Sequence, residues 1–162
     1  MGVEKSRFLE IVHEGMTRYP DYDELVFIGA DYLSPKWHGS LEELEEFARA
    51  SLERTMPTRG YELYARIYWA AGLVTDKKYA FQGPAANWGD MVKGMDEVIQ
   101  RYPSQWNIHF FTFFSCYKPD WDVAEKYMAL TEEPIVGDAW SPATNYKRCQ
   151  YGIEFAPRQA GE

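Results

Sequence analysis

The side chains of this sequence that could do chemistry are three histidines, two cysteines and many aromatic and acidic residues. His38 lies in the short segment Trp37-His38-Gly39-Ser40, where an indole beside an imidazole could bind a planar or cationic group. His109 lies in a strongly apolar run, where the expected role is that of a buried neutral histidine with one hydrogen bond. Either imidazole would act as a general base if a carboxylate lay beside it. His38 and His109 are therefore the candidates for a small hydrolase with a His–carboxylate pair.

Residue types that bind metals or phosphate lack the spacing of a known site. The chain has no HExxH segment, no closely spaced cysteine pair, no glycine-rich phosphate loop and no nucleophile elbow. We therefore assign no catalytic residue, no metal and no cofactor. Cys116 and Cys149 are the only cysteines, and two cysteines in a chain with this much apolar material predict reduced thiols in a cytosol.

Aromatic residues are the main candidates for a binding surface, because tyrosine and tryptophan give a large contact area for few rotatable bonds. The candidate binding residues are Trp37, His38, Tyr64, Tyr68, Trp106, Asn107 and His109. An acidic border is expected beside them, on the solvent side of a helix, from Glu42, Glu45 and Glu46. Such a border would attract a basic protein or peptide.

Composition limits the class of protein. The 162 residues are 46% hydrophobic and carry a net charge of −8, which predicts one folded domain over residues 1–162. An acidic chain without a basic cluster is a poor ligand for a phosphate backbone, so we expect no nucleic-acid partner. No apolar run reaches the length of a membrane-spanning helix, so we expect no membrane partner and a cytoplasmic location.

The elements that must position these residues are helices. Ser40 with Glu43 three residues later predicts a capping box, and the apolar residues that follow recur every three or four positions up to Pro57. Pro57 is expected to stop this helix. A second apolar run from Tyr61 ends at Gly72 and predicts an antiparallel partner helix.

Three such helix–proline–helix units follow one another along the chain. Their prolines, Pro20, Pro57 and Pro103, are separated by 37 and 46 residues. The predicted units cover about residues 5–35, 40–73 and 88–118, followed by a C-terminal cap over 119–152. This period predicts an all-α fold of stacked antiparallel hairpins, a tetratricopeptide-like α-solenoid. An irregular helical bundle with the same helices is the alternative.

The connecting segments carry predicted helix caps. Residues 74–90 predict a surface loop, with Asn87 or Asp90 capping the next helix. Asp21 and Asp23 are expected to cap the helix that starts near Glu24. A short helix over 141–150 is predicted, with Ser141 as its cap and Pro142 at its first position.

The segment Pro35-Lys36-Trp37-His38-Gly39-Ser40, with Leu44 and Phe47-Ala48, resembles a bacterial domain family of unknown function. Further matching positions are Arg101-Tyr102-Pro103, Trp106-Asn107, Pro134, Trp140 and Cys149. The resemblance covers roughly residues 20–150 and implies a helical, tetratricopeptide-like fold in a bacterial cytosol. It implies no catalytic residue.

These observations favour a protein–protein or peptide interaction module over an enzyme. The expected partner is a protein or peptide with basic residues, and self-association into a homo-oligomer is an alternative. Two other functions stay open: the small hydrolase, and an acidic inhibitor of the immunity-protein type that would mask a basic active site.

Overall fold

The computed structural model describes residues 4–37, 39–74 and 86–157, and this part of the chain is helical without strands. The prediction of an all-α fold is therefore confirmed. The chain divides into two compact units, Met1–Met95 and Asp96–Glu162. Packing of successive hairpins into a solenoid stays a prediction.

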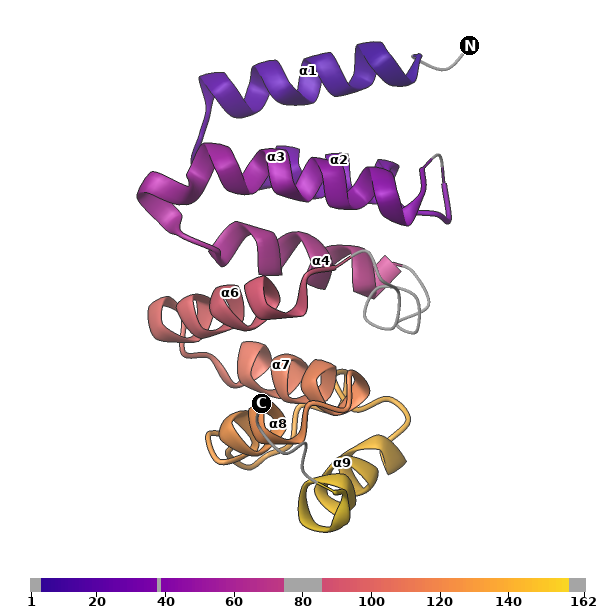
Figure 1. Cartoon of the computed structure of the whole chain (residues 1–162), viewed down its shortest axis with the longest axis vertical. Coiled ribbons are helices and arrows are strands. Elements are labelled where there is room, and N and C mark those ends of the chain that lie inside the picture. The colour runs from indigo at the N-terminus through magenta and orange to yellow at the C-terminus, as the bar shows by residue number, and fades with distance from the viewer. Residues whose placement is uncertain (1–3, 38, 75–85, 158–162) are drawn as a thin grey trace. The chain divides into compact units, whose positions relative to one another are not determined.

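The first unit packs its helices in neighbouring pairs. It contains α1 (Lys5–Arg18), α2 (Glu24–Tyr32), α3 (Leu41–Arg59), α4 (Glu62–Val74) and the first half of α6 (Trp88–Arg101). Helix α2 contacts α1, α3 and α4, and α3 contacts α4. Figure 1 shows α2 and α3 lying between α1 and α4.

Helix α3 shows why the sequence folds locally as it does. The Ser40 hydroxyl accepts the backbone N–H of Glu43 at 3.2 Å, as predicted, and Leu44, Phe47, Ala48 and Leu52 are buried along one face. The predicted stop at Pro57 is wrong, because the helix continues to Arg59. A proline in the last turn removes only one backbone hydrogen bond, and Gly60, with φ of 60°, ends the helix instead.

The second unit is built around α7 (Gln105–Tyr117). Its 13 residues include eight that are buried, four of them phenylalanines. Helix α7 contacts α8 (Trp121–Met128) and α9 (Thr144–Phe155), and α8 contacts α9. Both α8 and most of α9 fall within the segment 119–152 that was predicted as a C-terminal cap.

Helix caps were predicted with mixed success. Asn87 caps α6, because its Oδ1 accepts the Asp90 N–H at 3.0 Å. Ser141 does not cap α9, which starts at Thr144. Asp23 precedes α2 without a side-chain cap, because its carboxylate pairs with arginines of α3 and α4 instead.

Candidate functional site

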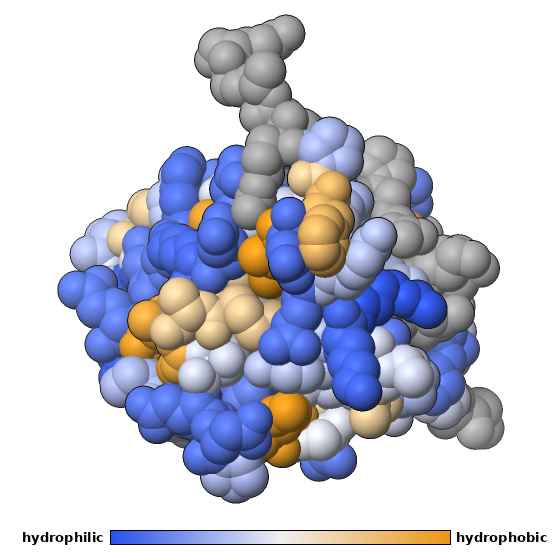
Figure 2. Space-filling model, turned by 90° about the horizontal axis from the view of Figure 1, so that it is seen from below, coloured by the Kyte–Doolittle hydropathy of each residue, from blue (hydrophilic) through white to orange (hydrophobic). Residues whose placement is uncertain are grey.

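Three of the seven predicted binding residues lie inside the core. Tyr64, Tyr68 and His109 are fully buried, so they line no surface groove. Trp37 and Trp106 are exposed, and Asn107 donates its side-chain amide to the Tyr102 carbonyl at 3.0 Å. His38 lies outside the described residues. The face drawn in Figure 2 is mostly hydrophilic, with its hydrophobic residues in small groups.

Glu45 is engaged within the fold rather than on an acidic border. Its Oε2 accepts the hydroxyls of Tyr64, at 2.7 Å, and Tyr68, and its Oε1 accepts Arg49 Nε at 2.7 Å. Burial, and secondarily the hydrogen bond to Glu45, raise the pKa of both tyrosines, which therefore stay protonated donors. The expected solvent-facing position of Glu45 is wrong, while Glu42 and Glu46 are exposed.

A second buried cluster pairs acids and arginines between α2, α3 and α4. Asp23 accepts hydrogen bonds from Arg59 and, at 2.6 Å, from Arg66. Glu62, fully buried, accepts from Arg59 at 2.7 Å. The hydrogen bond to Asp23 is the main cause that raises the pKa of Arg59, and burial opposes it. Two acids pair with two arginines here, so these charges stabilise the fold as a structural network.

One pocket of the first unit combines apolar walls with an arginine that has no carboxylate partner. It encloses about 270 Å³ and lies against the turn between α1 and α2. Its lining residues are Met16, Thr17, Tyr19, Pro20, Tyr22, Val26, Arg54, Thr55 and Leu63. Met16, Val26 and Leu63 belong to the buried core, whereas Tyr19 and Tyr22 are more than half exposed. The pocket therefore has an apolar floor and an aromatic rim.

Arg54 is exposed and donates only to neutral oxygens. Its Nη1 lies 3.3 Å from the His13 carbonyl and 3.4 Å from Thr17 Oγ1. The other five arginines within Met1–Met95 each form an ion pair with an aspartate or glutamate, and Arg54 forms none among the described residues. Its charge is thus available to a bound anion.

The electrostatic effect of Arg54 is visible at His13. Burial is the larger cause that lowers the pKa of His13, and the nearby positive charge of Arg54 lowers it further. The imidazole also stacks on Phe47, with ring centres 6.1 Å apart. His13 is thus disfavoured as a second cation beside the pocket, and Arg54 is the positive group there.

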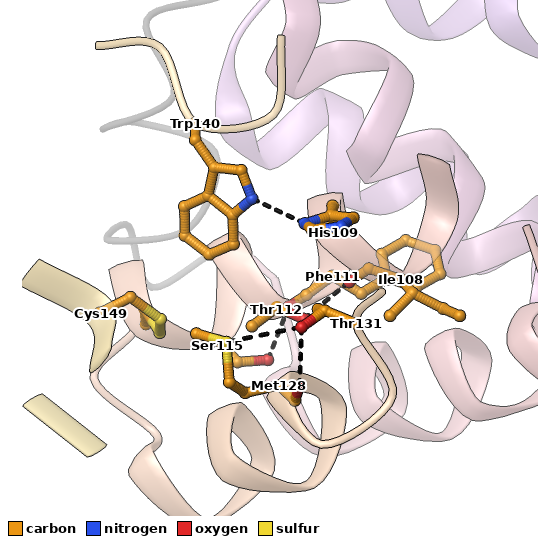
Figure 3. Close-up of a disulfide and its surroundings, with 10 residues drawn as sticks. Ile108, His109, Phe111, Thr112, Ser115, Met128, Thr131, Trp140 and Cys149 are labelled. Atoms are coloured by element: carbon orange, nitrogen blue, oxygen red, sulfur yellow. Dashed lines mark hydrogen bonds between the residues drawn. A yellow bond between two sulfur atoms is a disulfide. The ribbon is translucent and has the colours of Figure 1, made fainter. Parts of the chain in front are cut away.

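His109 is held by two hydrogen bonds inside the second unit. The Trp140 indole N–H donates to His109 Nδ1 at 2.8 Å, and His109 Nε2 lies 3.3 Å from the Glu132 carbonyl. Figure 3 shows the indole pointing directly at the imidazole of α7. Because an indole only donates, Nδ1 accepts and Nε2 carries the proton. Both nitrogens of His109 are occupied, which fits the predicted structural histidine.

The prediction of reduced thiols is wrong. Cys116 of α7 and Cys149 of α9 form a disulfide with their Cα atoms 5.4 Å apart. Helix packing brings together two residues that are 33 positions apart, and their spacing alone could not show this. Because disulfides persist mainly in oxidising compartments, the cysteines no longer support a cytosolic location.

The described part of the chain meets the requirements of neither a metal site nor a membrane-spanning helix. Across residues 4–37, 39–74 and 86–157, no three His, Cys, Asp or Glu side chains are grouped to hold a metal ion. No described helix combines the length and apolarity needed to cross a bilayer.

Comparison with known protein families, curated proteins and solved structures gives no match for this chain. The resemblance to a bacterial helical family therefore stays a prediction. The candidate site depends on the geometry of the pocket alone.

Sequence reasoning missed this pocket. Arg54, Tyr19 and Tyr22 are not among the binding residues predicted from the sequence. The sequence signal that could have pointed to the pocket was the pair of tyrosines on either side of Pro20. They form an exposed, rigid aromatic turn that faces α3. This signal could not be used without knowing that α3 continues past Pro57 and that the other arginines are paired.

Proposed function

We propose that the protein is a peptide-binding module whose Arg54 pocket takes a large apolar side chain next to a carboxylate. The observation that carries this proposal is the exposed, unpaired guanidinium of Arg54 at the edge of an apolar pocket of about 270 Å³. A water molecule occupies roughly 30 Å³, so the pocket has room for one large side chain.

The lining supports each part of such a ligand. The apolar floor would bury an aliphatic or aromatic side chain, and Tyr19 and Tyr22 would pack against the backbone on either side. Arginine presents a planar fork of donors that matches a carboxylate. The ligand's carboxylate, from an acidic residue or a chain end, would replace the two long contacts of Arg54 to neutral oxygens.

This partner differs from the basic peptide expected from the sequence. Glu45 is used by two tyrosines and Arg49, so the predicted acidic border loses one of its three members. Glu42 and Glu46 stay exposed but have no pocket assigned to them. The pocket supports the interaction-module class and changes the expected chemistry of the partner.

Selection of a random peptide library on the whole chain tests the proposal. We expect enrichment of peptides in which Leu, Phe or Tyr lies next to Asp, Glu or a free C-terminus. Arg54→Met should weaken the selected peptides by about 10- to 100-fold, the cost of one charged hydrogen-bonded contact. Arg7→Met is the matched control, because Arg7 is an exposed arginine of α1 paired with Glu10.

The same peptide selection can also contradict the proposal. Enrichment of Lys- and Arg-rich peptides that ignore Arg54→Met but are lost in a Glu42→Gln, Glu46→Gln double variant would overturn the proposal. That outcome would restore the acidic-surface hypothesis. Failure to enrich any peptide would also contradict a peptide-binding role for this pocket.

A further inference from the structure

The second unit contains a covalent link between α7 and α9, and α9 buries few of its own residues. Of the 12 residues of α9, the buried ones are Cys149 and Gly152. Helix α7, by contrast, buries eight of its 13 residues. Cys149 is thus both the disulfide partner and one of the two residues that anchor α9.

Helix α9 makes two further contacts with the rest of the unit, through Gly152 and Tyr146. A Cβ atom at Gly152 would lie 2.2 Å from the Trp121 ring, so the glycine lets the helix backbone lie directly against α8. Tyr146 packs edge-on against Trp140 with ring centres 5.0 Å apart. Tyr151 and Phe155 contact each other and are more than half exposed. The disulfide therefore acts together with the contacts of Gly152 and Tyr146 in holding α9 against the unit.

A small cavity lies against this bond. It measures about 70 Å³ and is lined by Phe113, Cys116, Tyr117, Trp121, Asn145, Arg148 and Cys149. That volume equals roughly two water molecules, enough for a thiolate sulfur and its methylene group. Cys116 is partly exposed, whereas Cys149 is only 2% exposed. Cys116 is therefore the more accessible of the two residues to an attacking thiolate.

Arg148 gives this cavity a preference for an anionic thiol. Its side chain is exposed and forms no ion pair within the described residues. A positive group beside a disulfide attracts a thiolate and the carboxylates that accompany it in small cellular thiols.

We propose that the Cys116–Cys149 disulfide is a thiol-exchange site, and that its reduction by an anionic low-molecular-weight thiol releases α9. A thiolate RS⁻ attacks Cys116 Sγ, an RS–S bond to Cys116 forms, and the Cys116–Cys149 bond breaks. Cys149 leaves as a thiolate and takes a proton from water. A second RS⁻ then displaces Cys116, giving RSSR and two protein thiols, so that two RSH are oxidised as the protein disulfide is reduced. Excess RSSR reverses both steps.

The site is independent of the Arg54 pocket, which lies in the other unit. The direct test treats the whole chain with glutathione and, separately, with the uncharged thiol 2-mercaptoethanol. Mass spectrometry follows the mixed disulfide, and hydrogen exchange follows the backbone amides of α7 and α9. We expect the mixed disulfide on Cys116, and amide exchange in α9 faster by about tenfold or more with α7 still protected.

Arg148→Gln supplies the charge control. It should slow the reaction with glutathione about threefold, the effect of one exposed charge, and leave the reaction with 2-mercaptoethanol unchanged. A Cys116→Ala, Cys149→Ala double variant should show the same rapid α9 exchange without any thiol.

Three results would overturn the proposal. They are a disulfide that resists both thiols until the chain unfolds, a reduced chain in which α9 stays as protected as before, and loss of protection in α7 and α9 together. The last outcome would show that the bond holds the whole unit rather than one helix.

Discussion

The two compact units stabilise their interiors by different means. In Met1–Met95, buried and half-buried charges join α2, α3, α4 and the start of α6 through two networks, one around Asp23 and one around Glu45. In Asp96–Glu162, the interior is a cluster of phenylalanines closed by the Trp140–His109 hydrogen bond and a disulfide.

This difference explains why one arginine stands out. In the first unit the arginines other than Arg54 each pair with an aspartate or glutamate. A buried charge that lacks its partner destabilises the fold, so such pairing is expected. Arg54 departs from that pattern at the edge of a pocket. In the second unit, hydrogen bonds within the fold use both nitrogens of His109, and the exposed Arg148 lies at the cavity beside the disulfide.

Removing the charge of Glu62 should produce the largest effect. Glu62→Gln keeps the shape of the side chain but removes the buried charge that pairs with Arg59 and Arg66. We expect the free energy of unfolding to fall by about 3–5 kcal/mol, the usual cost of breaking a buried ion pair. Urea denaturation measures it, and Glu46→Gln, an exposed glutamate of α3, should change stability by less than about 0.5 kcal/mol.

Equal effects of Glu62→Gln and Glu46→Gln would contradict a charge-based core. Apolar packing, and not its ion pairs, would then be what stabilises the first unit.

Removing the indole donor of Trp140 should have a medium effect. Trp140→Phe keeps an aromatic ring against Phe113 but leaves His109 Nδ1 without its donor. A buried polar atom without a partner costs about 1–3 kcal/mol. Thermal unfolding measures this loss, and Trp106→Phe is the matched control because Trp106 is 40% exposed. Similar losses in both variants would show that ring volume, and not the hydrogen bond, stabilises this unit.

The smallest expected effect is the pH dependence due to His13. Its pKa is lowered in the folded chain, so below pH 6.5 the unfolded chain binds more protons. Stability should therefore fall as the pH drops from about 6.5 toward the lowered pKa. NMR titration of the His13 ring should give a higher pKa in Arg54→Met than in the wild type. An unchanged pKa would show that the charge of Arg54 does not reach this imidazole.

Much of the helical pattern could be predicted from the sequence, because it depends on neighbours along the chain. The apolar face of α3 and the caps at Ser40 and Asn87 are set by residues three or four positions apart. Pro57 was misjudged because its effect depends on how near the helix already is to its end.

The candidate site could not be predicted in the same way, because its parts come from distant segments. Asp23 meets Arg66 across 43 residues, and Cys116 meets Cys149 across 33. Arg54 can be recognised as the arginine without an acidic partner only when the partners of the other arginines in the unit are known. The count of charges in the sequence contains no such information.

A titration with N-acetylphenylalanine, as its carboxylate and as its neutral amide, tests the Arg54 pocket most directly. NMR would follow the His13 ring and the amide of Thr55 in the wild type and in Arg54→Met. We predict that the carboxylate shifts both signals and raises the pKa of His13, that the amide binds about tenfold more weakly, and that Arg54→Met removes the difference. Equal binding of carboxylate and amide, or shifts confined to residues outside the pocket, would contradict the proposed function.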